Sequence, residues 1–231
     1  MAAVFFASAA TALPEDARTV AADSLPTAEI VHRMVLHDQT SNRDLKQYST
    51  LRDYHVVYHG YSITLEADMK VAVKYNAASG KQLQIVSENG SKFLVENVLK
   101  RAVTSEQEVA RDRAAANLTP ANYRFRLLGN DVIDGRPAYI LAVDPLVPSK
   151  FLYRGKVWVD AADFAVAKIE AQPARNPSLM ISRAQFHYTG TKTDGFWVPQ
   201  NVRGESNVRI GGVAVFTINY GNYEIASKPS Q

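Results

Sequence analysis

A strict alternation of apolar and polar side chains over residues 63–75 constrains the fold of this chain more than any other feature. The apolar side chains occupy every second position, at Ile63, Leu65, Ala67, Met69, Val71, Val73 and Tyr75. Successive side chains of a strand point to opposite faces, so the pattern predicts one long strand with an apolar face and a polar face. The polar face should carry Thr64, Glu66, Lys70 and Lys74. The apolar face requires a cover, which a second sheet, a helix or a ligand could provide.

Strands of the same kind recur over most of the chain. The period-two pattern begins at Leu51 and continues to Ile225, with turn-forming pairs such as Asn89-Gly90 and Asp134-Gly135 between its segments. Roughly ten or eleven strands are expected, and their short connections favour antiparallel pairing. The chain contains no internal repeat and no linker-like stretch, which predicts one domain.

Two helical segments interrupt the strands. An apolar stripe at helical spacing over residues 28–38 predicts the first helix, with Thr27 as its N-cap. Residues 91–117 return to helical spacing and form a central insertion. A few helices among many strands predict a mainly β (α+β) fold in which helices cover one face of a curved sheet.

Composition restricts the classes of function. The 231 residues carry a net charge of +3, and their Lys and Arg residues are scattered, which argues against a nucleic-acid-binding protein. The chain has no cysteine, which removes disulfides, thiolate metal sites and cysteine nucleophiles. The apolar N-terminal segment is too short to span a bilayer, and no later apolar run is long enough to do so.

The first residues resemble an export signal. Ala2 to Leu13 are small and apolar, and Ala10-Thr11-Ala12 fits the small-x-small pattern of a signal-peptidase site. We expect residues 1–12 to be a signal peptide that is cleaved near Ala12, so that the mature protein is periplasmic. The basic residues that usually precede such a run are missing, and a disordered Ala-rich leader is the alternative.

Three local stretches, in this order, resemble the LolA/LolB-like superfamily of periplasmic lipoprotein carriers. Leu51-Arg52-Asp53-Tyr54 stands where the family enters its first strand. The stretch over residues 135–145 resembles the family's central hairpin, and Gly155-Lys156-Val157-Trp158-Val159-Asp160 with residues 165–170 resembles the hairpin that follows. The resemblance covers residues 24–226 as a single half-barrel domain.

The resemblance implies an incomplete antiparallel barrel, closed by helices, with an apolar cavity for acyl chains. The implied partners are acyl chains or a lipoprotein, with a membrane-associated donor or acceptor protein, and the implied protein is a non-catalytic monomer without a cofactor. Relatives of the carriers also include envelope stress sensors. A protein-interaction module on the same fold is therefore the alternative function.

The apolar faces of the strands and of the insertion predict where a ligand would lie. The expected cavity lining consists of Tyr54, Val56, Leu65, Met69, Val71, Val73, Phe125 and Leu127. The expected lid over it consists of Phe93, Leu94, Val98 and Leu99. Curved sheets with helical covers leave room for ligands, although the same faces could also pack as a dry core.

Residues that could carry chemistry are sparse. His55 and His59 are four apart on a strand and share its polar face, but the sequence shows no third ligand to complete a zinc site. A hydrolase would require a nucleophile beside a base, and no serine stands in a recognised nucleophile motif. Asp160 and Asp163 bracket a turn, where aspartate is common for local hydrogen bonding. We therefore expect no catalytic residue, no metal and no cofactor.

Overall fold

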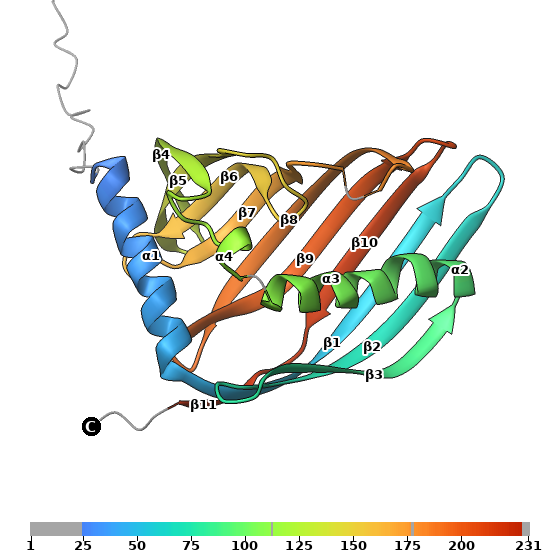
Figure 1. The fold of residues 1–231 in the computed structure, drawn as a ribbon, viewed down its shortest axis with the longest axis horizontal. Helices are drawn as coiled ribbons and strands as arrows, with labels where there is room; N and C mark the ends of the chain where they lie inside the picture. Colours follow the sequence, from blue (N-terminus) through green and yellow to red (C-terminus); the bar gives the residue numbers. More distant parts are fainter. Residues whose placement is uncertain (1–24, 112, 177, 228–231) are drawn as a thin grey trace, which may run out of the picture.

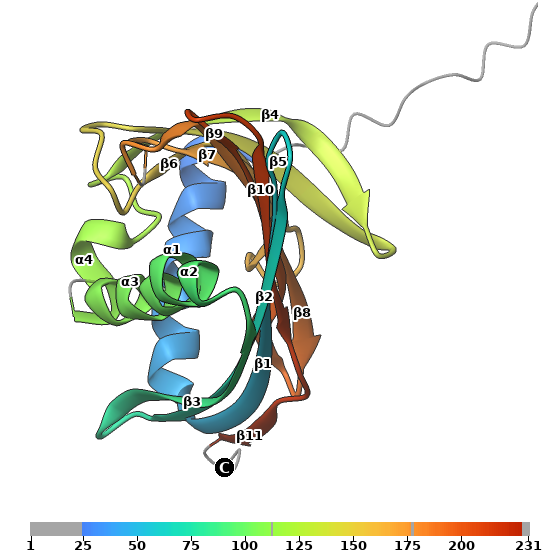
Figure 2. The ribbon, with the colours of Figure 1, turned by 90° about the vertical axis from the view of Figure 1, so that its right-hand side faces the viewer.

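The protein is an open antiparallel sheet with all its helices on one side, as Figures 1 and 2 show. The computed structural model describes residues 25–111, 113–176 and 178–227. The strands are β1 (Leu45–His59), β2 (Thr64–Asn76), β3 (Gly80–Gly90), β4 (Tyr123–Ile133), β5 (Arg136–Pro145), β6 (Tyr153–Asp160), β7 (Val166–Pro173), β8 (Ile181–Thr193), β9 (Phe196–Val208), β10 (Val213–Tyr220) and β11 (Glu224–Ser227).

The helices form two separate covers. The first is α1 (Thr27–Asp44), and the second is the chain α2 (Lys92–Leu94), η1 (Val95–Leu99, a π-helical turn), α3 (Lys100–Arg111) and α4 (Arg113–Ala116). In Figure 1, α1 stands over the β4–β7 half of the sheet, and α3 crosses β10, β1 and β2. Among the described residues, none of these helices is both long and apolar enough to cross a bilayer.

The sheet has two free edges. Its strand order is β3-β2-β1-β10-β9-β8-β7-β6-β5-β4, with β11 paired to β1, and every pairing is antiparallel. Strands β3 and β4 at the two ends do not pair with each other, so the barrel is incomplete. The predicted mainly β fold, a curved antiparallel sheet of ten or eleven strands under helices, is confirmed.

Strand β2 follows the predicted alternation. Met69, Val71 and Val73 are buried under the helices, whereas Lys70 and Lys74 are exposed on the other face, as predicted. The prediction for Ile63 was wrong: its side chain is 55% exposed. The Ile63 carbonyl accepts a hydrogen bond from the Gly60 amide within the β1–β2 turn, so the alternating pattern continues one residue past the start of the strand.

Helix α1 extends further than its apolar stripe predicted. It begins at Thr27 and continues to Asp44, where the chain passes directly into β1. The position before the helix is Pro26, and Thr27 does not cap it. The Thr27 hydroxyl instead accepts a hydrogen bond from the Leu127 amide at 3.3 Å, which ties the start of α1 to β4.

Candidate functional site

One face of the sheet is lined mainly by apolar side chains from β4 to β2, and this covered face is the candidate site. Residues paired directly across antiparallel strands point to the same face. The register places one continuous row on the helix side, from β4 to β2: Leu127, Leu141, Val157, Ile169, Tyr188, Val202, Ile218, Tyr54 and Met69. Each member is hydrophobic or a tyrosine, so the row is a floor on which an apolar partner could lie.

The half of this floor under the second helical cover is densely packed. Most of the expected lining residues lie here; the five most buried are at most 1% exposed: Tyr54, Val56, Met69, Val71 and Val73. Leu94 and Leu99 of the expected lid pack onto them, and Val98 and Leu65 lie partly buried at the margin. Phe93 is 64% exposed and lies outside this cover. The lid and lining therefore meet, but as a packed cluster.

The other half of the floor belongs to α1. Phe125 and Leu127 pack here against a cluster that includes Ile30, Val31 and Met34. The expected lining is thus divided between two clusters, because α1 and the α2–α3 segment each cover a different end of the sheet. No local sequence pattern indicates which helix covers which strands.

An open hollow of about 510 Å³ lies beside α1. Its walls are the first turns of α1 and the chain entering β4: Thr27, Ala28, Val31, His32, Val35, Pro120, Tyr123 and Phe125. Most of these side chains are apolar. Phe125 is the one expected lining residue among the walls of this hollow.

Aromatic side chains occupy the floor between the two covers. Phe186 on β8 meets the ring of Tyr153 edge-on, with ring centroids 5.4 Å apart, and Phe216 on β10 lies 6.1 Å from Tyr54. Burial raises the pKa of the neighbouring Tyr188 to about 12, so its hydroxyl stays neutral at physiological pH. This strip is apolar in character and uncharged, with Gly204 opposite Phe186 leaving its ring uncrowded.

A buried charge interrupts the apolar face. Arg52 occupies a helix-side position of β1 and is only 2% exposed. Its guanidinium donates to the Glu106 carboxylate of α3 at 2.6 Å, and Lys81 of β3 donates to the other oxygen of that carboxylate at 2.8 Å. These contacts connect α3 to the sheet at β1 and at β3.

The charges of this cluster stabilise one another. Burial alone would lower the pKa of the Arg52 guanidinium, but the Glu106 carboxylate outweighs that effect and raises it. Burial alone would raise the pKa of Glu106, yet Lys81 and Arg52 hold it below its usual value. The Tyr220 ring stacks 4.6 Å from the guanidinium, and the Arg52 Nε atom and the Tyr223 hydroxyl are buried without a partner. This cluster was not identified from the sequence. The one available sign was Arg52 itself, because a charge between Thr50 and Tyr54 on the apolar face requires a buried partner.

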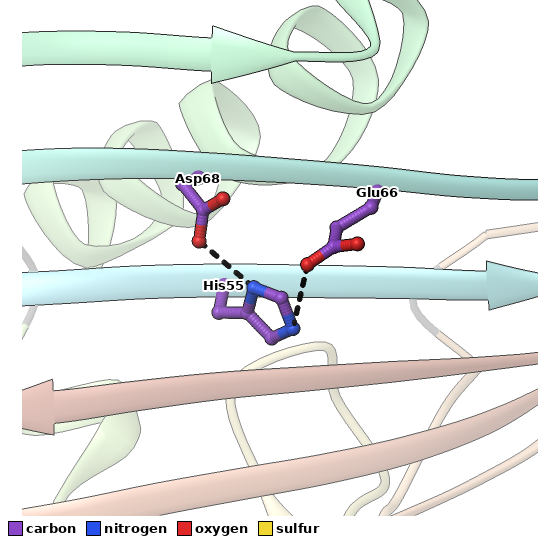
Figure 3. A group of neighbouring side chains, drawn as sticks. All are labelled: His55, Glu66 and Asp68. Carbon is purple, nitrogen blue, oxygen red and sulfur yellow. Dashed lines mark hydrogen bonds and ion pairs between the residues drawn. The ribbon is translucent and has the colours of Figure 1, made fainter.

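On the opposite, solvent-exposed face, His55 lies between two carboxylates, as Figure 3 shows. Asp68 is 2.8 Å from Nδ1, and Glu66 is 3.8 Å from Nε2. The sequence interpretation found no carboxylate near His55, and that was wrong, because the β1–β2 register places His55 directly opposite Asp68. His59 lies apart from this group, beside Thr64. The two carboxylates of β2 approach different nitrogens of the imidazole ring from the neighbouring strand.

Two further polar groups have local structural explanations. The Asp160 carboxylate accepts hydrogen bonds from the amides of Ala162 and Asp163, which confirms the predicted turn, and pairs with Arg136 at 2.6 Å. His37 contacts the Ser41 hydroxyl at 3.2 Å across one turn of α1. That spacing is the usual one for neighbours on a helix surface.

Comparison with known proteins gives only distant likenesses. No family model matches the chain, and no curated protein does. It is similar in structure to a DUF1329 family protein from Desulfovibrio piger, with 14% identity, a TM-score of 0.47, and coverage of 89% of this chain and 95% of that one.

Two further solved structures are similar at comparable coverage. A putative outer membrane lipoprotein-sorting protein domain from Vibrio parahaemolyticus is 12% identical, with a TM-score of 0.44 over 89% of this chain and 94% of that one. A LolA superfamily protein from Nitrosomonas europaea is 12% identical, with a TM-score of 0.37 over 89% and 96%. With TM-scores below 0.5, none of these structures indicates what this chain binds.

Proposed function

We propose that this chain is a non-catalytic periplasmic carrier that binds the acyl chain of a lipid or lipoprotein on its covered sheet face. The observation that carries the proposal is the apolar row from Leu127 to Met69, which the helices cover at its two ends. Each methylene that an acyl chain buries on such a surface contributes about 0.8 kcal/mol, so an apolar site alone can supply affinity.

The hollow beside α1 is the proposed entry to this site. Its volume of about 510 Å³ is within the usual range for small-ligand sites, and Phe125 and Val31 give it an apolar wall. The aromatic strip around Phe186 and Phe216 continues the same face toward the second cover. An acyl chain lying along this path would exchange water for hydrocarbon over its whole length.

Residues 1–12 support the proposed location. They lie outside the described residues, and their apolar run with Ala10-Thr11-Ala12 is the reason to propose export and cleavage near Ala12. Recovery of an N-terminally shortened chain from the periplasmic fraction would support this. An intact chain retained in the cytoplasm would argue against it.

The packed half of the floor favours a second candidate function. Val56, Val71 and Leu99 are fully buried, so the α2–α3 side offers its outer surface, rather than a cavity, for recognition. A protein-interaction module of the envelope stress-sensor type would use the fold in this way. Native mass spectrometry separates the two: co-purified lipid favours the carrier, and an empty chain with a specific protein partner favours the module.

Filling the hollow tests the carrier directly. Ala28 lines it and is exposed, so Ala28→Trp should block the hollow without disturbing the core. We expect binding of a fluorescent fatty acid to weaken by at least about tenfold, a difference of ~1.4 kcal/mol. The matched control is Leu36→Trp, on an exposed position of the same helix. Wild-type protein that binds no acyl probe, or equal binding by both variants, would contradict the proposal.

A further inference from the structure

The two ends of the sheet carry turns of opposite character. The turns at one end, over residues 77–79, 134–135, 161–165 and 194–195, contain none of the exposed large hydrophobic side chains of the described chain, and Asp134, Asp163 and Asp194 lie in them. Loops 60–63, 146–152, 174–180 and 209–212 connect the strands at the other end. We call these four loops the apolar rim; they lie along the top of the molecule in both Figure 1 and Figure 2.

The rim exposes a large hydrophobic side chain on each loop. Tyr61 is 92% exposed, Val147 71%, Leu179 92% and Ile210 70%. Side chains of this size are usually buried, and single exposed ones need no explanation. Their presence on four loops at one end, against none in the described turns at the other, makes the two ends differ in character.

Hydrogen bonds join the four loops into one surface. The Ala174 amide donates to the Leu152 carbonyl at 2.8 Å, which links loops 146–152 and 174–180. The Arg209 amide donates to the Met180 carbonyl at 2.8 Å and links the next pair. The Tyr58 hydroxyl donates to the Gly211 carbonyl at 2.6 Å, which connects loop 209–212 to β1 beside loop 60–63. The exposed side chains are therefore held in fixed relation to one another.

The charges of the rim have a single sign. The four loops contain Lys150, Arg175 and Arg209, and their sequences contain no Asp or Glu. Lys150 pairs with Glu108 of α3, whereas Arg175 and Arg209 are exposed and belong to the same loops as Leu179 and Ile210. Exposed hydrophobic tips among cations match the interface of an anionic bilayer, where hydrocarbon lies below a layer of phosphates.

We propose that the apolar rim docks the protein on an anionic phospholipid surface. Leu179 and Ile210 enter the boundary between headgroups and acyl chains, and Arg175 and Arg209 contact lipid phosphates. The hollow beside α1 is close to this surface, because the Leu146 amide donates to the Asn122 carbonyl at 2.8 Å, next to Tyr123 in the wall of the hollow. Docking does not depend on what the hollow binds.

A single dye on the rim tests the contact. The chain has no cysteine, so Ile210→Cys gives one attachment point for an environment-sensitive fluorophore. The control is Val132→Cys, an exposed hydrophobic position beside the turn at the opposite end. Vesicles of phosphatidylglycerol mixed with phosphatidylcholine should shift the emission of the rim dye to the blue and leave the control unchanged. No shift at position 210, or an equal shift at both positions, would overturn the proposal.

Vesicle sedimentation of the full chain separates the apolar and charged contributions. We expect Leu179→Ser combined with Ile210→Ser to weaken binding on the order of tenfold. Arg175→Gln combined with Arg209→Gln should have an effect of similar order on anionic vesicles and reduce the salt dependence. Arg203→Gln, exposed in the middle of β9, is the charge control and should bind normally. All variants share the same N-terminus, so differences among them report on the rim.

Two outcomes would contradict membrane docking, whether or not the protein proves to be a carrier. Wild-type protein that binds pure phosphatidylcholine as well as anionic vesicles would exclude recognition of negative charge. Rim variants that sediment like Arg203→Gln would exclude the rim itself, and a protein partner would then be the better occupant. Thermal melting of each variant verifies its fold, and fatty-acid binding by the rim variants should equal that of the wild type.

Discussion

Arg52 and Glu106 lie 54 residues apart in the chain and meet at 2.6 Å, where they join the middle of β1 to α3. Arg52 has almost no exposed surface, and Lys81 binds the same carboxylate. A buried charge that loses its partner remains costly, because the solvation that it lost on folding is no longer compensated. The pair therefore holds α3 in place only while both charges are present.

The first prediction removes one of these charges. Glu106→Gln leaves Arg52 buried without a counter-ion, and we expect the free energy of unfolding to fall by about 3 kcal/mol. Urea denaturation at neutral pH measures the change. Glu96→Gln is the matched control on the same helical segment, since Glu96 is exposed and its partner Lys100 is partly exposed and also pairs with Glu88. Equal stability of the two variants would show that the Arg52–Glu106 pair does not anchor α3.

The second prediction concerns acid. The pKa of Glu106 is lower in the folded protein than its usual value, so the folded state binds fewer protons at this group than the unfolded state does. Its contribution is fully present above the unfolded pKa, about 4.3, and is lost as the pH falls through the lower folded value. Asp160 and Asp163 also have lowered pKa values and act in the same window. The stability difference between wild type and Glu106→Gln should therefore narrow below about pH 4.

A third prediction tests the packed half of the floor. Val71→Gln places an amide at a fully buried position of β2 and should destabilise the fold by ~1–3 kcal/mol. The control, Val86→Gln, is on the neighbouring β3, where the side chain is mostly exposed, and should change little. If Val71→Gln instead retained full stability and lost fatty-acid binding, the region under α2–α3 would have to be a ligand cavity and not a packed cluster.

The fourth prediction concerns the passage from β3 into the helices. Gly90 has φ +86°, and a Cβ there would lie 2.3 Å from the Glu66 carbonyl oxygen. Gly80 has φ +80° with no atom within 4 Å of its Cβ position. Gly80→Ala should therefore cost only about 1 kcal/mol for the backbone conformation, and Gly90→Ala clearly more, because β3 must also move away from β2. Melting temperatures that decrease equally would rule out the close contact at Gly90.

The sequence predicted those features that depend on one element at a time. The alternation around Met69 identified the buried face of β2, and the change to helical spacing after Ser91 located the second cover. Features that depend on two distant elements were not predictable. His55 meets Asp68 through strand register, and Phe125 packs under α1 because that helix covers the β4 end. Neither relation has a local pattern, because the first depends on the pairing register of β1 and β2 and the second on which end of the sheet α1 covers.

The second helical cover begins at one free edge of the sheet and ends at the other. The chain leaves β3 at Gly90, passes through α2, η1, α3 and α4, and enters β4 at Tyr123. This segment is thus a strap across the open side of the half-barrel, fastened near its middle by Arg52. Its length limits how far β3 and β4 can separate. A ligand that widened the sheet would have to stretch this strap. Binding of a ligand under the helices and extension of the strap would therefore be coupled.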